Sequence, residues 1–113
     1  MIPRAIHKPG VMNKTEAAYA ELLQGLKLNG KIQDYKFECV KLKLADKTHY
    51  TPDFMVISAD GEVEFHEVKG FWRDDARVKI KVAAEIYPFR FIAVQKRSRK
   101  DGGGWRVEKI TKE

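Results

Sequence analysis

Two carboxylates and one lysine in this sequence could together bind a metal ion and a phosphate. Asp53 lies near the start of a predicted strand, and Glu67 and Lys69 lie near the end of the next strand along the chain. Carboxylate oxygens are preferred ligands of hard divalent cations such as Mg2+ and Mn2+, and a lysine ammonium group can stabilise phosphate charge. These side chains can act together only if the register of the two strands brings them to one place.

The turn between the two strands sets this register. Gly61 suits the left-handed position of a three-residue hairpin loop, residues 59–61, in which such a position is required. This loop length places the apolar side chains of both strands on one face, which a shift of one residue would prevent. The predicted partners are Ile57 with Val63 and Met55 with Phe65.

The same register places Asp53 directly opposite Glu67, with Lys69 two residues further along on the same face. Like charges in this arrangement repel each other and destabilise a hairpin. A divalent cation between the carboxylates would relieve the repulsion. An ion pair of Lys69 with either acid at a solvated sheet edge is the structural alternative, and the register alone does not decide between the two.

Two helices and several strands are predicted around this hairpin. The first helix begins after Asn13, a good N-cap, and Glu16 three residues later completes a capping box; the helix ends at 29–30. The second helix covers about residues 74–87 and ends before Pro88. The predicted strands are 32–44 with a bulge near 39–40, 50–58, 62–69, 89–95 and a short last strand at 105–110.

This order of elements predicts an α/β fold in a single domain spanning residues 1–113. A helix, a three-stranded antiparallel meander, a second helix and a further strand would form a core with a mixed central sheet. Residues 1–12 contain two prolines and a glycine and are expected to form an extended arm. Residues 96–104 are expected to form a basic, glycine-rich loop before the last strand.

The segment Pro52-Asp53, the hairpin after it and the tripeptide Glu67-Val68-Lys69 resemble the signature of the PD-(D/E)xK nuclease superfamily. In that superfamily the two parts of the signature lie on the second and third strands of a restriction-endonuclease-like core, which has the element order predicted here. The resemblance covers about residues 13–95. The small size and the glutamate on the first helix are similar to phage-encoded endonucleases, including the endonuclease I type that resolves Holliday junctions.

The resemblance implies a DNA endonuclease that depends on Mg2+ or Mn2+ and hydrolyses phosphodiester bonds, with branched or junction DNA as a candidate substrate. It implies that Asp53, Glu67 and the backbone carbonyl of Val68 bind the metal ion, and that Lys69 orients or helps to deprotonate the attacking water. Glu16 would complete the catalytic metal site, although its capping role also accounts for the residue. The sequence leaves open a catalytically silent nucleic-acid-binding module of the same fold, and a nuclease that trims single strands or DNA ends.

The charge of the chain favours DNA as its partner. The sequence has 22 Lys and Arg against 16 Asp and Glu, which gives a net charge of +6, and a basic excess favours polyanions. Two clusters are expected to contact DNA phosphates, although a solvated charged face is the usual alternative. They are Arg73, Arg77 and Lys81 on the second helix, and Lys96, Arg97, Arg99 and Lys100 in the glycine-rich loop.

The composition also bears on compartment and assembly. The longest apolar runs are far shorter than the ~20 residues of a membrane span, and the N-terminal residues include no apolar secretory segment. The single cysteine, Cys39, cannot form an internal disulfide and is expected to be buried in a strand. We therefore expect no membrane contact and a cytoplasmic location, in the host cell if the protein is phage-encoded. A homodimer would supply the two active sites that double-strand cutting requires.

Overall fold

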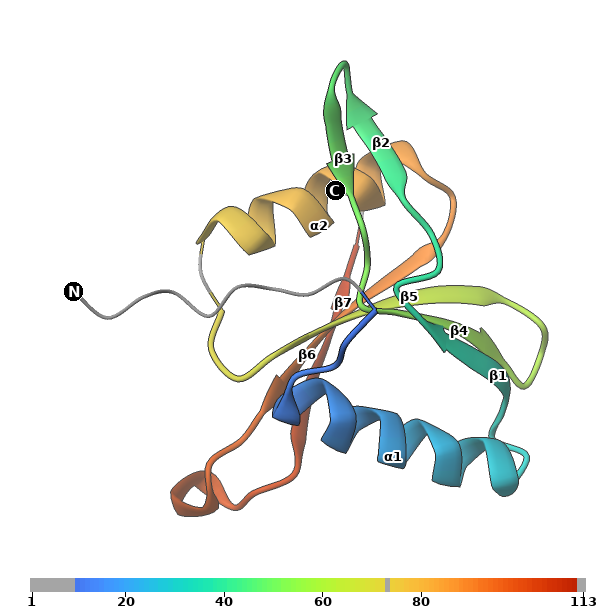
Figure 1. Cartoon of the computed structure of the whole chain (residues 1–113), viewed down its shortest axis with the longest axis vertical. Helices are drawn as coiled ribbons and strands as arrows, with labels where there is room; N and C mark the ends of the chain where they lie inside the picture. The colour runs from blue at the N-terminus through green and yellow to red at the C-terminus, as the bar shows by residue number, and fades with distance from the viewer. Residues whose placement is uncertain (1–9, 73, 112–113) are drawn as a thin grey trace.

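Two helices cover opposite faces of a mixed five-stranded sheet (Figure 1). The computed structural model describes residues 10–72 and 74–111 of the chain. Its elements are α1 (Lys14–Leu28), β1 (Ile32–Phe37), β2 (Leu42–Ala45), β3 (Thr48–Tyr50), β4 (Phe54–Ser58), β5 (Val63–Lys69), α2 (Asp74–Ile86), β6 (Arg90–Lys96), the short 3-10 helix η1 (Arg99–Asp101) and β7 (Trp105–Ile110). The predicted α/β fold with a mixed sheet is confirmed, whereas most of the predicted arm lies outside the described residues.

The strands of the large sheet follow the order β1-β4-β5-β6-β7. Strands β1, β4 and β5 form an antiparallel meander, and β6 lies parallel to β5. A parallel neighbour requires a crossover connection, which α2 provides. Strand β7 pairs antiparallel with β6 and ends the sheet at one edge.

The β4–β5 hairpin has the predicted register. Ile57 pairs with Val63, and Met55 pairs with Phe65. Gly61 in the turn has a φ of 85°, a left-handed conformation that glycine adopts without steric cost. The apolar pattern and this turn residue together were sufficient to predict the hairpin that carries the acidic residues.

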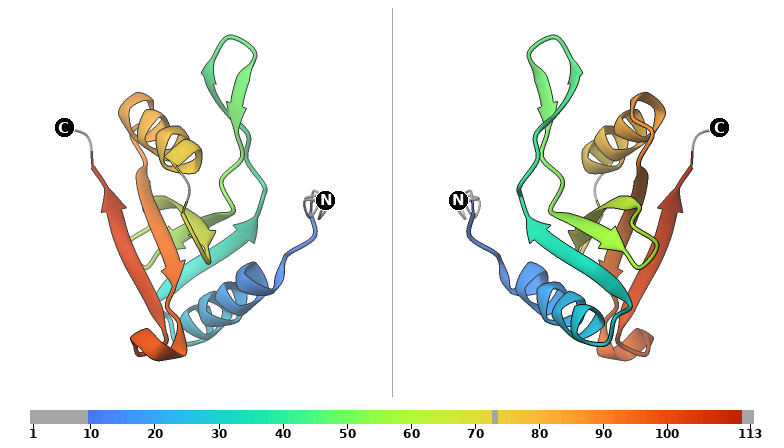
Figure 2. Two further views of the ribbon diagram at one scale, coloured as in Figure 1. Left: turned by 90° about the vertical axis from the view of Figure 1, so that its left-hand side faces the viewer. Right: turned by 90° about the vertical axis from the view of Figure 1, so that its right-hand side faces the viewer.

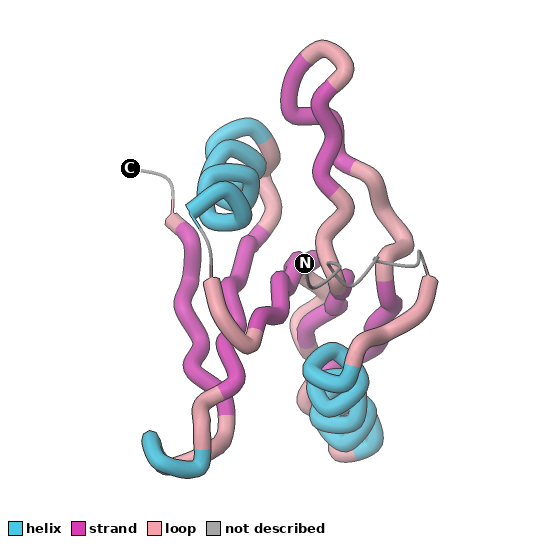
Figure 3. The backbone as a smooth tube through the Cα atoms, turned by 60° about the vertical axis from the view of Figure 1, so that its left-hand side comes forward, coloured by secondary structure: helices cyan, strands magenta, loops and turns pink. Residues whose placement is uncertain are grey.

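Two of the predicted strands are broken in the structure. The predicted strand 32–44 is interrupted after β1, where Glu38 takes a left-handed φ of 46°. The predicted strand 50–58 is interrupted between β3 and β4 at Pro52, which has no N–H to donate to a ladder. Strands β2 and β3 pair only with each other, and they form a separate hairpin that projects beyond the five-stranded sheet and contacts α2 (Figure 3).

The prediction that Cys39 is buried in a strand is wrong. Cys39 lies in the interruption between β1 and β2, and its side chain is exposed. The alternation of apolar residues before and after Cys39 belongs to two different sheets, so the chain leaves the first sheet before the cysteine is reached.

One apolar cluster lies on each face of the sheet. On one face, Tyr19 and Leu23 of α1 pack with residues of β4, β5 and β6. On the other face, Ile80 and Ala83 of α2 pack with further residues of the sheet and with Tyr50 from the β2–β3 hairpin. Burying a large apolar side chain contributes about 1.5–3 kcal/mol, so this packing holds both helices on the sheet.

Within the described part of the chain, no helix is long and apolar enough to cross a membrane.

A series of polar contacts ties α1 to β5. The Tyr19 hydroxyl lies 2.7 Å from Nδ1 of His66, and Nε2 of the same ring lies 3.0 Å from Oε1 of Glu64. The other carboxylate oxygen of Glu64 accepts a hydrogen bond from Arg90 at 3.2 Å. Tyr19 and His66 are both buried, where a polar group without a partner costs more free energy than at the surface. These contacts therefore fix the position of α1 relative to the strand that carries Glu67.

We predict that Tyr19→Phe lowers the free energy of unfolding by about 1–3 kcal/mol, because the buried ring nitrogen of His66 loses its partner. Urea denaturation measures the change. Tyr35→Phe is the matched control, since the Tyr35 hydroxyl donates to Gln24 at an exposed position, and its loss should be below about 0.5 kcal/mol. Equal losses in the two variants would show that the Tyr19–His66 contact does not stabilise the fold.

Candidate functional site

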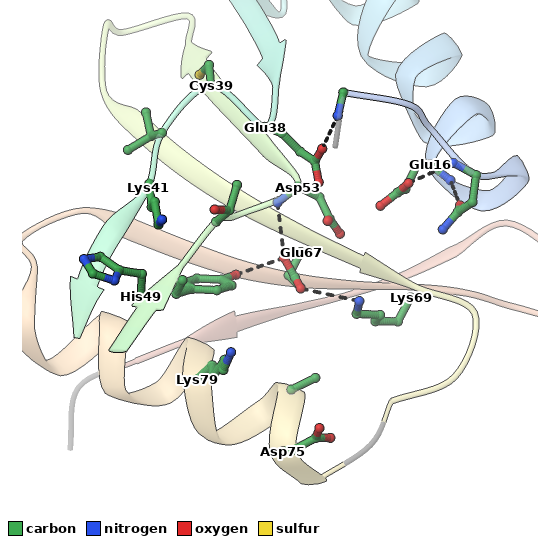
Figure 4. A pocket seen from close by; sticks show the side chains of 16 residues that line it. Glu16, Glu38, Cys39, Lys41, His49, Asp53, Glu67, Lys69, Asp75 and Lys79 are labelled. Atoms are coloured by element: carbon green, nitrogen blue, oxygen red, sulfur yellow. Dashed lines mark hydrogen bonds and ion pairs between the residues drawn. The ribbon is translucent and has the colours of Figure 1, made fainter. Parts of the chain in front are cut away.

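A cleft of about 840 Å³ lies where α1, α2, the β2–β3 hairpin and the adjoining ends of β4 and β5 meet. Figure 4 shows Asp53 and Glu67 near the centre of this cleft, with Lys69 beside Glu67. A concave site with several convergent polar groups is the usual place for a ligand to bind. The charged residues that line it include Glu16, Lys41, Asp53, Glu67, Lys69 and Lys79.

Asp53 and Glu67 meet at the floor of the cleft. Asp53 directly precedes β4 and Glu67 lies on β5, so the register of the hairpin brings them together. The N–H of Val68 donates to Oδ2 of Asp53 at 2.8 Å, and the N–H of Asp53 donates to Oε1 of Glu67 at 3.2 Å. The hydroxyl of Tyr50 donates to the same oxygen of Glu67 at 3.0 Å. The structure therefore contains the predicted pair of carboxylates, each held by hydrogen-bond donors.

Burial of this pair changes its electrostatics. The exposed fraction is 5% for Asp53 and 7% for Glu67. Burial, and then the negative charge of Glu67, raises the pKa of Asp53 to about 8, although the Val68 N–H and Lys69 act in the opposite direction. Burial also raises the pKa of Glu67, while Lys69 and the Tyr50 hydroxyl oppose this shift. The pair therefore retains a proton near neutral pH unless a cation binds beside it.

Lys69 lies at the end of β5 that faces the cleft. Its Nζ is 3.6 Å from Oε2 of Glu67, and 36% of its side chain is exposed. The Lys69–Glu67 ion pair, which the sequence left open, is present, but the two acids are buried in the cleft floor and do not lie at a solvated edge. A partly exposed lysine that lines the cleft beside two buried carboxylates can also contact a ligand there.

Glu16 lines the same cleft from α1 and also caps that helix. Its Oε1 accepts a hydrogen bond from the Asn13 N–H at 2.9 Å, and Oδ1 of Asn13 accepts one from the Glu16 N–H at 2.8 Å. The predicted capping box is thereby confirmed. Glu16 is only 3% exposed, and its charge contributes to the raised pKa of Asp53. Capping and proximity to the acidic pair therefore coexist in one side chain.

The oxygen atoms at the cleft floor suit a hard cation. The N–H and the C=O of one strand residue face the same neighbouring strand, so the Val68 carbonyl points to the side of Asp53, as the Val68 N–H does. Within residues 10–72 and 74–111, no three Asp, Glu, His or Cys side chains are grouped closely enough to hold a metal ion. The available side-chain ligands are therefore Asp53 and Glu67, and a ligand role for Glu16 stays a prediction.

Several residues of the cleft were not expected from the sequence. Tyr50 holds Glu67 through its hydroxyl, and Lys41 and Lys79 line the walls. Tyr50 stands between His49 and Thr51 in the sequence, and nothing in this pattern places it beside Glu67. His49 is exposed and also lines the cleft.

The predicted basic residues on α2 have different environments. Arg77 donates from Nη2 to both carboxylate oxygens of Glu108, at 3.1 and 2.8 Å, and its guanidinium lies 5.8 Å from the ring centroid of Trp72. Lys81 is exposed, and Arg73 lies outside the described residues. Lys79 of α2 lines the cleft that contains Asp53 and Glu67, whereas Lys81 does not.

The predicted basic loop begins near the site but does not line the cleft. Lys69 pairs with Gln95 in the parallel β5–β6 ladder, so the loop follows the end of the sheet that carries the site. Lys96, which was predicted to be the first loop residue, is instead the last residue of β6 and pairs with Trp105. The basic residues of the predicted loop are exposed, and the guanidinium of Arg97 donates to the Asp101 carbonyl within the turn. These residues are Lys96, Arg97, Arg99 and Lys100.

Comparison of the chain with models of known protein families, with curated proteins and with solved structures finds no match.

We predict that Asp53→Asn raises the free energy of unfolding by on the order of 1–3 kcal/mol near pH 8 in the absence of divalent cations. In the unfolded chain Asp53 loses its proton near pH ~4, whereas in the folded protein it retains the proton up to about pH 8. The folded state binds more protons in this interval, so the stability of the parent protein falls as the pH rises through it. Asparagine has no such proton to lose.

Urea denaturation of both proteins between these two pH values measures the difference. The gain should be absent at the acidic end and should grow towards the alkaline end. Asp46→Asn, an exposed change in the turn of the β2–β3 hairpin, should produce no such gain. A difference between Asp53→Asn and the parent that does not vary with pH would contradict the explanation by charge burial.

A second prediction separates the capping role of Glu16 from its charge. Glu16→Ala removes the acceptor of the Asn13 N–H and should lower the free energy of unfolding by about 1 kcal/mol. Glu16→Gln keeps an oxygen at that position and should restore most of the loss. If thermal denaturation shows that the two variants are equally destabilised, the capping box is not what Glu16 contributes to stability.

Proposed function

We propose that this chain is a metal-dependent DNA endonuclease that hydrolyses phosphodiester bonds. The observation that carries the proposal is the buried Asp53–Glu67 pair, held side by side in an open cleft next to Lys69. Burying two like charges together destabilises a fold, and strongly perturbed acids in a cleft are typical of functional sites. The resemblance of Pro52-Asp53 and Glu67-Val68-Lys69 to the PD-(D/E)xK signature supports phosphodiester hydrolysis as the reaction.

The donor atoms at the cleft floor fit Mg2+ or Mn2+. Asp53, Glu67 and the Val68 carbonyl would hold the ion through oxygen atoms, which both metals prefer. The negative charge of Glu67 already raises the pKa of Asp53, so added positive charge would be favourable at this place. A bound ion would neutralise charge on a phosphate and lower the pKa of water.

The chain's own residues would provide the positioning and the remaining charge. Lys69 would contact the phosphate or orient the attacking water, and its ion pair with Glu67 holds it at the cleft floor. Lys41 and Lys79 on the cleft walls would offset phosphate charges. Phosphoryl transfer needs mainly positioning and electrostatic stabilisation from the protein, which this set of residues can provide.

DNA is the proposed partner, with branched or junction DNA as a candidate substrate on the strength of the resemblance. The exposed basic residues from Lys96, the last residue of β6, to Lys100 lie at the end of the sheet that carries the site, where they would follow a phosphate backbone away from the cleft. Lys81 on α2 and Arg73 are further proposed contacts with DNA phosphates.

The proposed location of the protein is the cytoplasm, which is that of the host cell if the protein is phage-encoded.

The proposal is tested by incubating the protein with supercoiled plasmid, single-stranded DNA and four-way-junction DNA, each with Mg2+, Mn2+ or EDTA. We expect cleavage that requires the metal, and a loss of at least about 100-fold in rate for Asp53→Asn, Glu67→Gln and Lys69→Ala. Lys43→Ala is the matched lysine control, since Lys43 is exposed on the β2–β3 hairpin and does not line the cleft. It should cut at the rate of the parent protein.

The outcomes distinguish the functions that the sequence left open. Metal-independent binding of DNA without cleavage of any substrate would identify a catalytically silent binding module. Release of nucleotides from DNA ends, with closed circular plasmid left intact, would identify a trimming nuclease. Loss of cleavage in Glu16→Gln with its stability retained would give Glu16 a role at the metal.

A further inference from the structure

In the part of the chain that the structure describes, no strand pairs with the outer edge of β7. Strand β7 is the last strand of the five-stranded sheet, and Figure 2 shows it at the margin of the molecule, with both helices lying to one side of it. An edge strand of this kind offers a row of N–H and C=O groups to another strand.

The backbone groups on this open edge belong to alternate residues. The Arg97 N–H donates to the Gly104 carbonyl at 2.9 Å, and the pairing of β6 with β7 continues from there without a shift. Residues 106, 108 and 110 therefore direct their N–H and C=O groups to β6, because these groups alternate along a strand. Trp105, Val107 and Lys109 direct theirs outwards.

An antiparallel copy of β7 centred on Val107 would satisfy these outward groups. The two Val107 residues would exchange both of their backbone hydrogen bonds across the two-fold axis, and Trp105 of each chain would do the same with Lys109 of the other. Val107 is 59% exposed, so the two valine side chains would also bury apolar surface at the axis.

The charges of β7 favour the same centre. Pairing centred on Val107 places Arg106 of each chain opposite Glu108 of the other, which brings opposite charges together. Centring the pair on Arg106 or on Glu108 would instead place like charges face to face. Glu108 is about half exposed and already accepts from Arg77, so a second guanidinium would extend an existing charge network.

The other edge of the sheet is not equally open. Strand β1 has a register irregularity between Ile32 and Asp34, and bulges hinder edge-to-edge pairing. The Tyr35 N–H donates to Oδ1 of Asp34 at 2.8 Å, so a side chain of β1 itself occupies a donor that a further strand would use.

From these observations we infer that β7 is a dimerisation surface, and that its partner is β7 of a second copy of this chain. The two sheets join into one continuous sheet through antiparallel strands centred on Val107. The partner is specified by the self-complementary order of Arg106, Val107 and Glu108 and by the alternation of the backbone groups. This inference does not depend on the proposed nuclease activity.

Sedimentation velocity of the full chain, from micromolar to hundreds of micromolar concentration, tests the inference. We expect a reversible monomer–dimer equilibrium. Arg106→Glu places two acids opposite each other at both symmetric positions, so the dissociation constant should rise at least about tenfold. The double variant Arg106→Glu/Glu108→Arg restores opposite charges in the same register and should dimerise again.

Val107→Lys provides a second variant that does not touch the Arg77–Glu108 contact. It places two ammonium groups at the two-fold axis and should also dissociate the dimer, while circular dichroism shows that the exposed substitution leaves the fold intact. Lys36→Glu, an exposed charge reversal on β1 at the other edge, is the control and should dimerise like the parent. A monomeric parent protein, or a dimer that withstands both Arg106→Glu and Val107→Lys, would overturn the inference.

Discussion

Two carboxyl side chains, those of Asp53 and Glu67, are buried against each other at the floor of the cleft, and contacts from several elements hold them there. The Val68 N–H holds Asp53, and the Tyr50 hydroxyl holds Glu67. Burying charge in this way costs free energy. The apolar clusters under α1 and α2, one on each face of the sheet, offset this cost. The packing on both faces therefore stabilises the sheet that carries the site.

The interruption of the chain around Pro52 is as important to the site as the strands are. Because β4 begins only at Phe54, the Val68 N–H on β5 has no backbone carbonyl of β4 opposite it and instead donates to the Asp53 carboxylate. The same interruption lets the β2–β3 hairpin leave the sheet and pack against α2. Tyr50 thereby reaches Glu67, so one break in a strand both frees a donor and forms a wall of the cleft.

The predictable residues of the site share one hairpin, whereas the unpredictable ones belong to other elements that pack against it. Asp53 and Glu67 are joined by one short hairpin, whose register follows from local alternation and from Gly61. Tyr50 reaches the cleft through the separate β2–β3 hairpin, and Lys79 reaches it through the crossover helix α2. Helical spacing predicts that Arg77 shares a face with its neighbours at four-residue intervals, but not that this face meets Glu108 on β7.

The sequence by itself determined the α/β class, the capping box of α1 and the meeting of Asp53 with Glu67, because each depends on turn residues, caps and side-chain alternation within a short stretch of chain. Only the tertiary structure decided where the strands around residues 38 and 52 break, which lysine faces the cleft and that the acids are buried. Alternation in the sequence shows which side chains share one face of a strand, but packing against other segments decides which face is covered. The chemistry at the cleft floor is thus local in the sequence, whereas its burial, its walls and its raised pKa values come from the assembled fold.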